Sequence, residues 1–267
     1  MEINEHTKTC ISVAERPGKF GLRFHNQGYE RMGINQIYLP LKVNREDLPG
    51  VIQLVRENFK GCSVSMPHKI EVLGYLNEID RSAETTGACN TILNLGNGKL
   101  RGYNTDYFGA KSAIESKIEN LNGQKVLMIG AGGVACAVGR VVKDLGGELT
   151  ISNRTNESAK NLAEALGANC LPWEDRNSSA GYLLINATPI GMGNETACPV
   201  DEETISNYNA VMDVVASNKT KLIRTAEENR LITITGKTMT IHQAEKQFEI
   251  YTGKKLPADF ISTFLNE

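Results

Sequence analysis

Residues 125–135 read KVLMIGAGGVA, an apolar run followed by three glycines within four positions. Residues 126–129 are all apolar and the run is short, which predicts a buried β-strand. The pattern over residues 134–145 predicts an α-helix, so the glycines at 130–133 form the turn between them. The segment therefore predicts one strand–turn–helix unit of an α/β fold.

The glycine-rich turn has the pattern G-x-G-x-x-A, one form of the dinucleotide-binding fingerprint. Gly130 permits a tight turn, Gly132 lets the backbone approach a pyrophosphate, and Ala135 permits close helix–strand packing. Free N–H groups at the helix start attract phosphates. A glycine turn can also serve chain reversal alone, but its place between a strand and a helix favours nucleotide binding. The expected contacts are Gly130, Ala131, Gly132, Gly133, Val134 and Ala135.

The alternation of short apolar strands with helices extends over most of the chain, which predicts a parallel sheet with helices on both faces. The sequence GNG at 96–98 predicts a hairpin between two of the strands. The expected strands are residues 36–43, 62–65, 91–94, 99–102, 126–129, 148–152, 183–186, 211–215 and 231–235, and the expected helices are 48–59, 67–79, 134–145, 157–166 and 239–251.

The residues after the second strand of the glycine-turn unit indicate which cofactor binds. An Asp or Glu there accepts a hydrogen bond from the ribose 2′-hydroxyl of NAD. This chain has Asn153, Arg154 and Thr155 instead. An arginine can hold a 2′-phosphate through charge-assisted bonds, whereas an acid would repel it. We therefore predict NADP; the alternative is that Arg154 is only a solvated neighbour of a helix cap.

Composition and charge exclude several classes of protein. The chain has 267 residues, 40% of them hydrophobic and 22% charged, with a formal net charge of -2. It therefore reads as a globular protein of two domains or one large domain, without the basic surface that nucleic acid or an anionic membrane requires. No apolar run approaches the roughly 18 residues of a membrane span, and the N-terminus lacks the apolar segment of a signal peptide. We expect no membrane or nucleic-acid partner.

The cysteines and histidines do not predict a metal site. None of the six cysteines forms a C-x-x-C pair, and none of the four histidines has metal-ligand spacing relative to another. We expect no metal. The simplest interpretation of the cysteines is buried reduced thiols in a cytoplasmic protein.

Two polar segments are candidates for chemistry. VSMPHK at 64–69 places Lys69 in the first turn of the helix expected over 67–79, where the helix dipole disfavours the ammonium form. Lys69 would then donate and accept protons at neutral pH, although a lone lysine is more often a surface charge. Asn104, Thr105 and Asp106 follow a glycine-bearing strand, where such residues commonly form an Asx-type turn or a helix N-cap.

Taken as an ordered set, these motifs resemble the shikimate dehydrogenase family, and most of all its divergent shikimate dehydrogenase-like members. The motifs occur in the family's order and cover nearly the whole chain. The matching segments are SVSMPHK at 63–69, GACNT at 87–91, NTD at 104–106, GAGG at 130–133, NRT at 153–155 and NATPIGM at 186–192, together with Gly236, Met239 and Gln243.

The resemblance implies an NADP-dependent enzyme of aromatic amino-acid biosynthesis that interconverts 3-dehydroshikimate and shikimate. It implies an N-terminal α/β substrate domain over residues 1–105, completed by a returning C-terminal helix within 239–267. A Rossmann-type NADP domain would occupy residues 106–238. Either a monomer or a homodimer is compatible with this organisation.

The resemblance also assigns roles to individual residues. Lys69 would be the acid/base and Asp106 its partner, both at the ring hydroxyls of the substrate. Ser65 stands where the family usually has threonine, at a substrate-binding position. Asn90 and Gln243 would hydrogen-bond the ring hydroxyls. The residues expected to line the nicotinamide side are Thr188, Val214, Gly236 and Met239.

Two departures from the family fall in the substrate pocket. The two serines that hold the substrate carboxylate in the family are replaced by Lys19 and Gly21, and a tyrosine after a late strand is replaced by Ala216. Lys19 could pair with the carboxylate, or it could be a solvated loop charge. We therefore expect either slow turnover of shikimate or a preference for a related cyclic hydroxy acid.

Two other functions remain open from the sequence. A quinate-type dehydrogenase that uses NAD would have an Asp near the end of the second strand, and Arg154 disfavours it. A catalytically inactive nucleotide or metabolite sensor is compatible with the altered carboxylate site. It would have no need of both Lys69 and Asp106.

Overall fold

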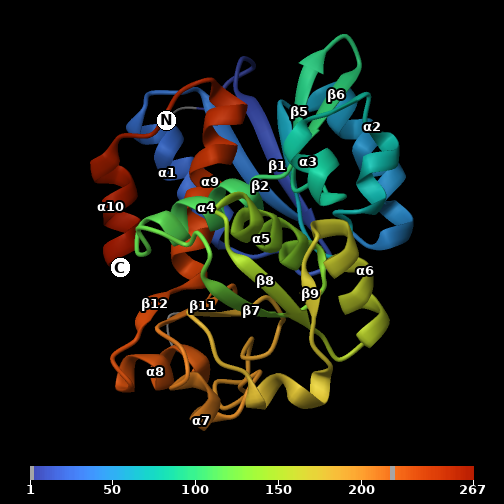
Figure 1. The fold of residues 1–267 in the computed structure, drawn as a ribbon. Helices are drawn as coiled ribbons and strands as arrows, with labels where there is room; N and C mark the ends of the chain where they lie inside the picture. The colour runs from blue at the N-terminus through green and yellow to red at the C-terminus, as the bar shows by residue number, and fades with distance from the viewer. Residues whose placement is uncertain (1–2, 217–219) are drawn as a thin grey trace. The chain divides into compact units, whose positions relative to one another are not determined.

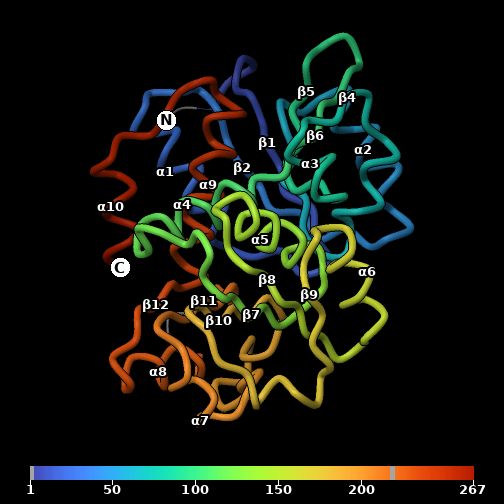
Figure 2. The backbone as a smooth tube through the Cα atoms, viewed as in Figure 1, coloured from blue at the N-terminus to red at the C-terminus, as the bar shows by residue number. Residues whose placement is uncertain are grey.

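The computed structural model describes residues 3–216 and 220–267 (Figure 1). The chain divides into two compact units, one formed by the residues up to Thr105 together with Gln243–Glu267, and the other by Asp106–His242. The backbone passes out of the first unit after Thr105 and re-enters it within helix α9 (Gly236–Thr252), as can be followed in Figure 2. The division inside α9 lies slightly beyond the boundary expected after residue 238.

The first unit contains a six-stranded mixed sheet in the order β2-β1-β3-β5-β6-β4. β1 is parallel to β2 and β3, while β5 runs antiparallel to β3 and to β6. The expected hairpin is present, and its turn residues Gly96, Asn97 and Gly98 all have positive φ. The hairpin is the reason that this sheet is not wholly parallel. The strands are β1 (Lys8–Ala14), β2 (Gln36–Lys42), β3 (Gly61–Val64), β4 (Glu78–Ile79), β5 (Thr91–Gly96) and β6 (Lys99–Tyr103).

The two faces of this first sheet differ in chemistry, because successive side chains of a strand point to opposite faces. On β3, Cys62 and Val64 join the apolar core beneath α2 and α3. Gly61 and Ser63 face α9, and a Cβ at Gly61 would lie 2.5 Å from the ring of Tyr251. Glycine at this position therefore lets α9 pack closely on the sheet. The helices of this unit besides α9 are α1 (Phe20–Arg31), η1 (Arg45–Asp47), α2 (Leu48–Asn58), η2 (Glu71–Tyr75), α3 (Arg81–Thr86) and α10 (Ala258–Asn266).

The second unit contains a parallel six-stranded sheet in the order β12-β11-β10-β7-β8-β9. The first strand of this unit, β7, lies at the centre of the sheet. β8 and β9 follow on one side of it, and the chain then crosses to β10, β11 and β12 on the other side. This is the doubly wound arrangement in which ligands bind outside the carboxyl ends of the strands. The strands are β7 (Lys125–Ile129), β8 (Glu148–Ser152), β9 (Asn169–Cys170), β10 (Leu183–Asn186), β11 (Ala210–Asp213) and β12 (Ile232–Ile234).

Helices cover both faces of the second sheet, as the apolar strands predict. Val126 and Met128 pack in one cluster with residues of α4, α5 and α6. Leu127 and Ile129 pack in another cluster with residues of α7 and α8. A strand buried on both faces reads as a continuous apolar run. The helices are α4 (Asp106–Glu115), α5 (Gly133–Asp144), α6 (Asn156–Leu166), η3 (Trp173–Ser178), α7 (Glu202–Ile205) and α8 (Lys221–Glu228).

The helix expected over residues 67–79 is wrong. Residues 66–70 form turns, the 3₁₀ helix η2 follows, and β4 occupies the end of the segment. Of the apolar residues Ile70, Leu73, Leu76 and Ile79, only Leu73 lies in η2, and Ile70 and Ile79 are exposed. Their spacing of three, without residues at i+4, therefore does not mark the buried face of an α-helix. Lys69 therefore does not lie at the N-terminus of an α-helix, and the dipole argument for its chemistry no longer applies.

The cysteines are only partly as expected. All six are free thiols, but only Cys10, Cys62 and Cys89 are buried, while Cys136, Cys170 and Cys198 are half-buried. Among the residues that the structure describes, no helix combines the length and the apolar character needed to cross a membrane.

Candidate active site

The register of the second sheet aligns four strand ends at one edge. Ile129 of β7 lies beside Ser152 of β8 and Asn186 of β10, and Asn186 lies beside Asp213 of β11. Apart from Gly236 and Met239, every cofactor-binding residue predicted from the sequence lies in a segment that follows one of these four strand ends. Carboxyl ends of parallel strands are the usual place for a ligand in this type of fold.

The glycine turn after β7 has the geometry that a phosphate site needs. Gly130 has a φ of 121°, and a Cβ there would lie 2.7 Å from the carbonyl oxygen of Ala187. Gly132 is exposed, with no atom within 4 Å of its Cβ position. Helix α5 begins directly after it, with no side-chain cap bond and no acidic residue in its first turn. Its first N–H groups and dipole are therefore available to an anion, which fits a dinucleotide pyrophosphate.

The turn after β8 carries the residues predicted to select NADP. Asn153 donates from Nδ2 to the carbonyl of Thr155 at 3.0 Å, which closes the turn before α6. Arg154 is exposed, and its guanidinium forms no ion pair within residues 3–216 and 220–267. A cation that is not neutralised by the protein is suited to a phosphate group.

The predicted nicotinamide-side residues come together at the ends of β10, β11 and β12. Asn186 accepts from the N–H and the hydroxyl of Thr188 at 3.1 and 2.6 Å, which fixes the turn after β10. A Cβ at Gly236 would overlap the backbone of Val215 and Val214, so the start of α9 lies directly against the segment that follows β11. Val214 and Met239 pack against the same apolar cluster.

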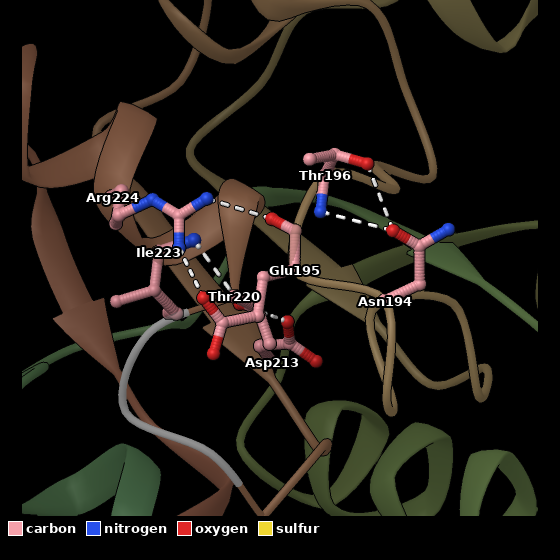
Figure 3. A network of polar contacts seen from close by, with 7 residues as sticks. All are labelled: Asn194, Glu195, Thr196, Asp213, Thr220, Ile223 and Arg224. Carbon is pink, nitrogen blue, oxygen red and sulfur yellow. Dashed lines mark hydrogen bonds and ion pairs between the residues drawn. The ribbon is translucent and has the colours of Figure 1, made fainter.

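Asp213 joins several segments behind this edge, and Figure 3 shows its contact with Thr220. Its carboxylate accepts from Thr220 Oγ1 at 2.7 Å, from the N–H of Val215 at 3.0 Å, and from Asn186 Nδ2 at 3.0 Å. Burial raises the pKa of Asp213, and these three hydrogen bonds oppose the shift. Arg224 in turn donates to the carbonyl of Glu195 at 2.7 Å, which attaches the segment after β10 to α8.

In the first unit, backbone contacts bring Ser65, Lys69 and Asn90 together. The N–H of Cys89 donates to the carbonyl of Lys69 at 2.7 Å, and Asn90 is the next residue. The carbonyl of Asn90 accepts from the N–H of Val64 at 2.8 Å, and Ser65 follows Val64. Lys69 is half-buried and Ser65 is exposed. Three of the predicted substrate-side residues thus lie in one region although they come from two different loops.

Asn90 and Gln243 also meet, through Thr105. Asn90 Oδ1 accepts from the N–H of Thr105 at 2.8 Å and from its hydroxyl at 3.1 Å. Gln243 Nε2 donates to the same hydroxyl at 3.1 Å. Thr105 is fully buried, and the next residue, Asp106, is 6% exposed and begins α4. The chain therefore presents Asp106 immediately after a hydrogen-bonded cluster.

Lys19 is not tied to this region. It is exposed at the N-cap position of α1, and its ammonium has no hydrogen bond or ion pair with the part of the chain that the structure describes. Gly21 lies against Tyr38, whose ring carbon Cε1 and hydroxyl would each be 3.1 Å from an added Cβ. A serine at position 21 would therefore require Tyr38 to move. Ala216 is exposed and has no hydrogen-bonding group in its side chain.

The sequence interpretation missed Gln247, which is 4% exposed. Its Nε2 donates to the carbonyl of Asn90 at 3.2 Å and to Thr91 Oγ1 at 2.9 Å. Its Oε1 accepts from Ser63 Oγ at 3.1 Å. The one available signal was its spacing, because Gln247 lies one helical turn after Gln243 and so on the same side of α9.

The chain matches two family profiles. The profile of the shikimate dehydrogenase substrate binding domain matches residues 21–92, and that of shikimate/quinate 5-dehydrogenase matches residues 112–180. Together they cover about half of the chain.

Individual relatives match over much longer stretches. A shikimate dehydrogenase (NADP(+)) of Alkaliphilus oremlandii is 34% identical over 98% of each chain. A shikimate dehydrogenase-like protein of Haemophilus influenzae is 36% identical over 96% of this chain and 94% of its own. A bifunctional 3-dehydroquinate dehydratase/shikimate dehydrogenase of Arabidopsis thaliana is 36% identical over 88% of this chain, which spans 42% of that larger protein.

A solved structure has the same fold. It is the crystal structure of shikimate 5-dehydrogenase from Thermus thermophilus in complex with NADP(H) and shikimate. It superimposes with a TM-score of 0.86 and 27% identity, over 97% of this chain and 98% of the other.

Proposed function

The chain belongs to the shikimate dehydrogenase family, and we propose on this premise that it is an NADP-dependent oxidoreductase that interconverts shikimate and 3-dehydroshikimate, or a closely related cyclic hydroxy acid. The observation that carries the proposal is the alignment of strand ends in the second sheet. It places the glycine turn, the Asn153–Thr155 turn and the Thr188 turn at one edge. These are the three segments that a dinucleotide needs for its pyrophosphate, its 2′-phosphate and its nicotinamide.

The second unit would hold the cofactor and the first unit the substrate. The backbone N–H groups after Gly132 would bind the pyrophosphate, and Arg154 would bind the 2′-phosphate. Thr188, Val214, Gly236 and Met239 would border the nicotinamide. Asn90, Gln243 and Ser65 would bind the ring hydroxyls of the substrate.

When bound, NADPH supplies the hydride that reduces the ring ketone. The protein's own contribution is to move a proton and to hold the ring in place. Lys69 would donate a proton to the oxygen that becomes the hydroxyl, and would accept it in the reverse direction. Asp106 would orient Lys69 and the hydroxyl. Hydrogen bonds from Asn90 and Gln243 would fix the ring so that the reacting carbon is presented consistently.

The altered carboxylate positions predict a divergent substrate preference. Two serine hydroxyls are absent at positions 19 and 21, and the tyrosine hydroxyl is absent at position 216. Each lost hydrogen bond to a buried carboxylate costs about 1–3 kcal/mol, or roughly 10- to 100-fold in affinity. Lys19 would compensate only if its exposed ammonium turned toward the substrate. We therefore expect shikimate to be a slow substrate, or an acid with a differently placed carboxylate to be preferred.

The proposed setting is a cytoplasmic enzyme that acts on a small molecule as a monomer or homodimer. No observation favours a quinate-type enzyme or an inactive sensor. Arg154 follows β8 where an NAD-specific enzyme would have an acid, and both Lys69 and Asp106 are retained.

The test is a spectrophotometric assay of NADPH formation with NADP and a panel of shikimate, quinate and related cyclic hydroxy acids. Reduction of NADP with one of these acids supports the proposal, and its identity selects the substrate. Reduction of NAD with quinate in preference would support the quinate-type alternative. Binding of NADP without turnover of any acid would leave a sensor as the function.

A further inference from the structure

A cluster of buried polar groups lies behind the proposed substrate-binding residues of the first unit. It occupies the face of the sheet that packs against α9, where Ser12 of β1 is paired in register with Ser63 of β3. Ser63 Oγ lies 2.9 Å from the hydroxyl of Tyr251, and Tyr38 of the neighbouring strand is buried in the same unit. Gln247 joins this cluster to Asn90. A buried polar network of this kind is costly unless every member is paired, so its pattern deserves a functional explanation.

The orientation of the Gln247 amide is determined by its partners. The carbonyl of Asn90 can only accept a hydrogen bond, so the nitrogen end of the amide must face it. The oxygen end then accepts from Ser63 at 3.1 Å and faces His25 Nε2 at 3.4 Å. Burial lowers the pKa of His25 to about 3, so the ring is neutral near pH 7. The amide is therefore held at both ends, with no freedom to flip.

Two short paths lead from this amide to the proposed site. Gln247 Nε2 bonds the main-chain carbonyl of Asn90 directly. It also donates at 2.9 Å to Thr91 Oγ1, which donates at 2.8 Å to Asn90 Oδ1. The same Oδ1 accepts from Thr105. Gln247 thus acts on both the backbone and the side chain of Asn90.

Gln243 and Gln247 hold this cluster from the same helix. Gln243 bonds Thr105 Oγ1, and Gln247, one turn later, bonds Asn90 and Thr91. The second glutamine is too deeply buried to contact a substrate, being 4% exposed. We propose that Gln247 is a positioning residue of the dehydrogenase reaction, which fixes Asn90 and Thr105 for substrate binding; this rests on the proposed function of the first unit.

The experiment compares two buried glutamines of the first unit. Gln247→Met removes both polar ends at similar length. Gln36→Met is the matched control, because Gln36 is 2% exposed and bonds Tyr29 and Cys10, with no contact to Asn90. Both variants lose buried hydrogen bonds and should lose stability. Only Gln247→Met should lower kcat/KM for the acid substrate, by about tenfold for one lost hydrogen bond, while KM for NADP stays within about twofold.

A second readout does not depend on turnover. The N–H of Thr105 is buried and donates to Asn90 Oδ1, so its hydrogen exchange reports on that contact. Exchange at Thr105 should become about tenfold faster than in wild type in Gln247→Met and not in Gln36→Met. If the wild-type protein turned over no acid, the proposed function would fail, and Thr105 exchange would still decide the structural part of the inference.

Unchanged kcat/KM and unchanged Thr105 exchange in a folded Gln247→Met variant would overturn the inference, as would equal effects from Gln36→Met. Should Gln247→Met not fold, Thr91→Val replaces it, because it removes the hydroxyl between Gln247 and Asn90 at nearly the same volume. The same loss of kcat/KM with unchanged KM for NADP is then expected. Wild-type kinetics in Thr91→Val would overturn the inference.

Discussion

Gly130→Ala should destabilise the second unit. Gly130 has a φ of 121°, and residues with a Cβ pay about 1–3 kcal/mol in such conformations. The added methyl group would lie 2.7 Å from the carbonyl oxygen of Ala187, a backbone atom that cannot rotate away. Overpacking of this kind costs a further amount of about 1–3 kcal/mol. The sum is about 2–6 kcal/mol, and each kcal/mol lowers the melting temperature by about 2–4 °C.

Gly132→Ala is the matched variant with the opposite expectation. Gly132 has a φ of -90°, which any residue can adopt, and nothing lies within 4 Å of its Cβ position. The stability of the protein without cofactor should change by less than about 1 kcal/mol. The methyl group would, however, stand where the pyrophosphate is proposed to approach. The Kd for NADP should therefore rise by at least about tenfold.

Both variants can be tested by thermal unfolding with and without NADP, with calorimetric titration for the Kd. Wild-type protein should gain about 2.7 kcal/mol when NADP is present at a hundred times its Kd. Gly132→Ala should unfold at the wild-type temperature but gain less from the same NADP concentration. The reasoning is refuted if Gly130→Ala melts with the wild type, or if Gly132→Ala binds NADP as tightly as the wild type.

Three further predictions concern single side chains. Lys69→Ala should lower kcat for the acid substrate by about 10²–10⁴-fold without changing KM for NADP; near-wild-type turnover with an unchanged pH profile would contradict its role. Arg154→Ala should raise KM for NADP but not for NAD in steady-state assays, whereas Lys160→Ala, an exposed cation on the following helix, should change neither. Burial lowers the pKa of His25 from 6.5 to about 3, so the unfolded chain binds the extra proton between these values, and the unfolding free energy should fall by up to about 1.4 kcal/mol per pH unit as pH drops through that window. Urea titrations should show that His25→Phe removes this slope and that His6→Asn, on the surface, retains it.

The second unit could be predicted from the sequence better than the first. Strand β7 is buried on both faces and its residues 126–129 form a continuous apolar run, while β8 alternates polar and apolar residues over 148–152, so both patterns predict the strands that the structure has. Strand β1 neither alternates polar and apolar residues nor forms a continuous apolar run, because Ser12 interrupts its apolar residues, and helix α1 contains Gly21 and Gly28, which lower helix propensity. Neither was predicted. Gly28 is used for packing, since a Cβ there would lie 2.9 Å from Phe248.

The candidate site shows the same limit. The ordered motifs supply Lys69, Asn90 and Gln243, because each stands in a recognisable local pattern. Gln247 has no such pattern, because its role depends on α9 packing across β3, and its contact with Ser63 joins residues 184 positions apart in the chain. Contacts of that range follow from how helices pack on a sheet and not from spacing along the sequence.

The discontinuous first unit has a consequence for synthesis on the ribosome. Strands β1 to β3 are translated early, but α9, which packs on the polar face of β3, is translated near the end of the chain. The second unit is one continuous segment and has all its own strands before α9 is finished. A nascent chain arrested just before Gln243 would therefore contain every residue of the second unit. In the same chain, Ser63 would lack its two hydrogen-bond partners from α9, because Gln247 and Tyr251 have not yet been synthesised.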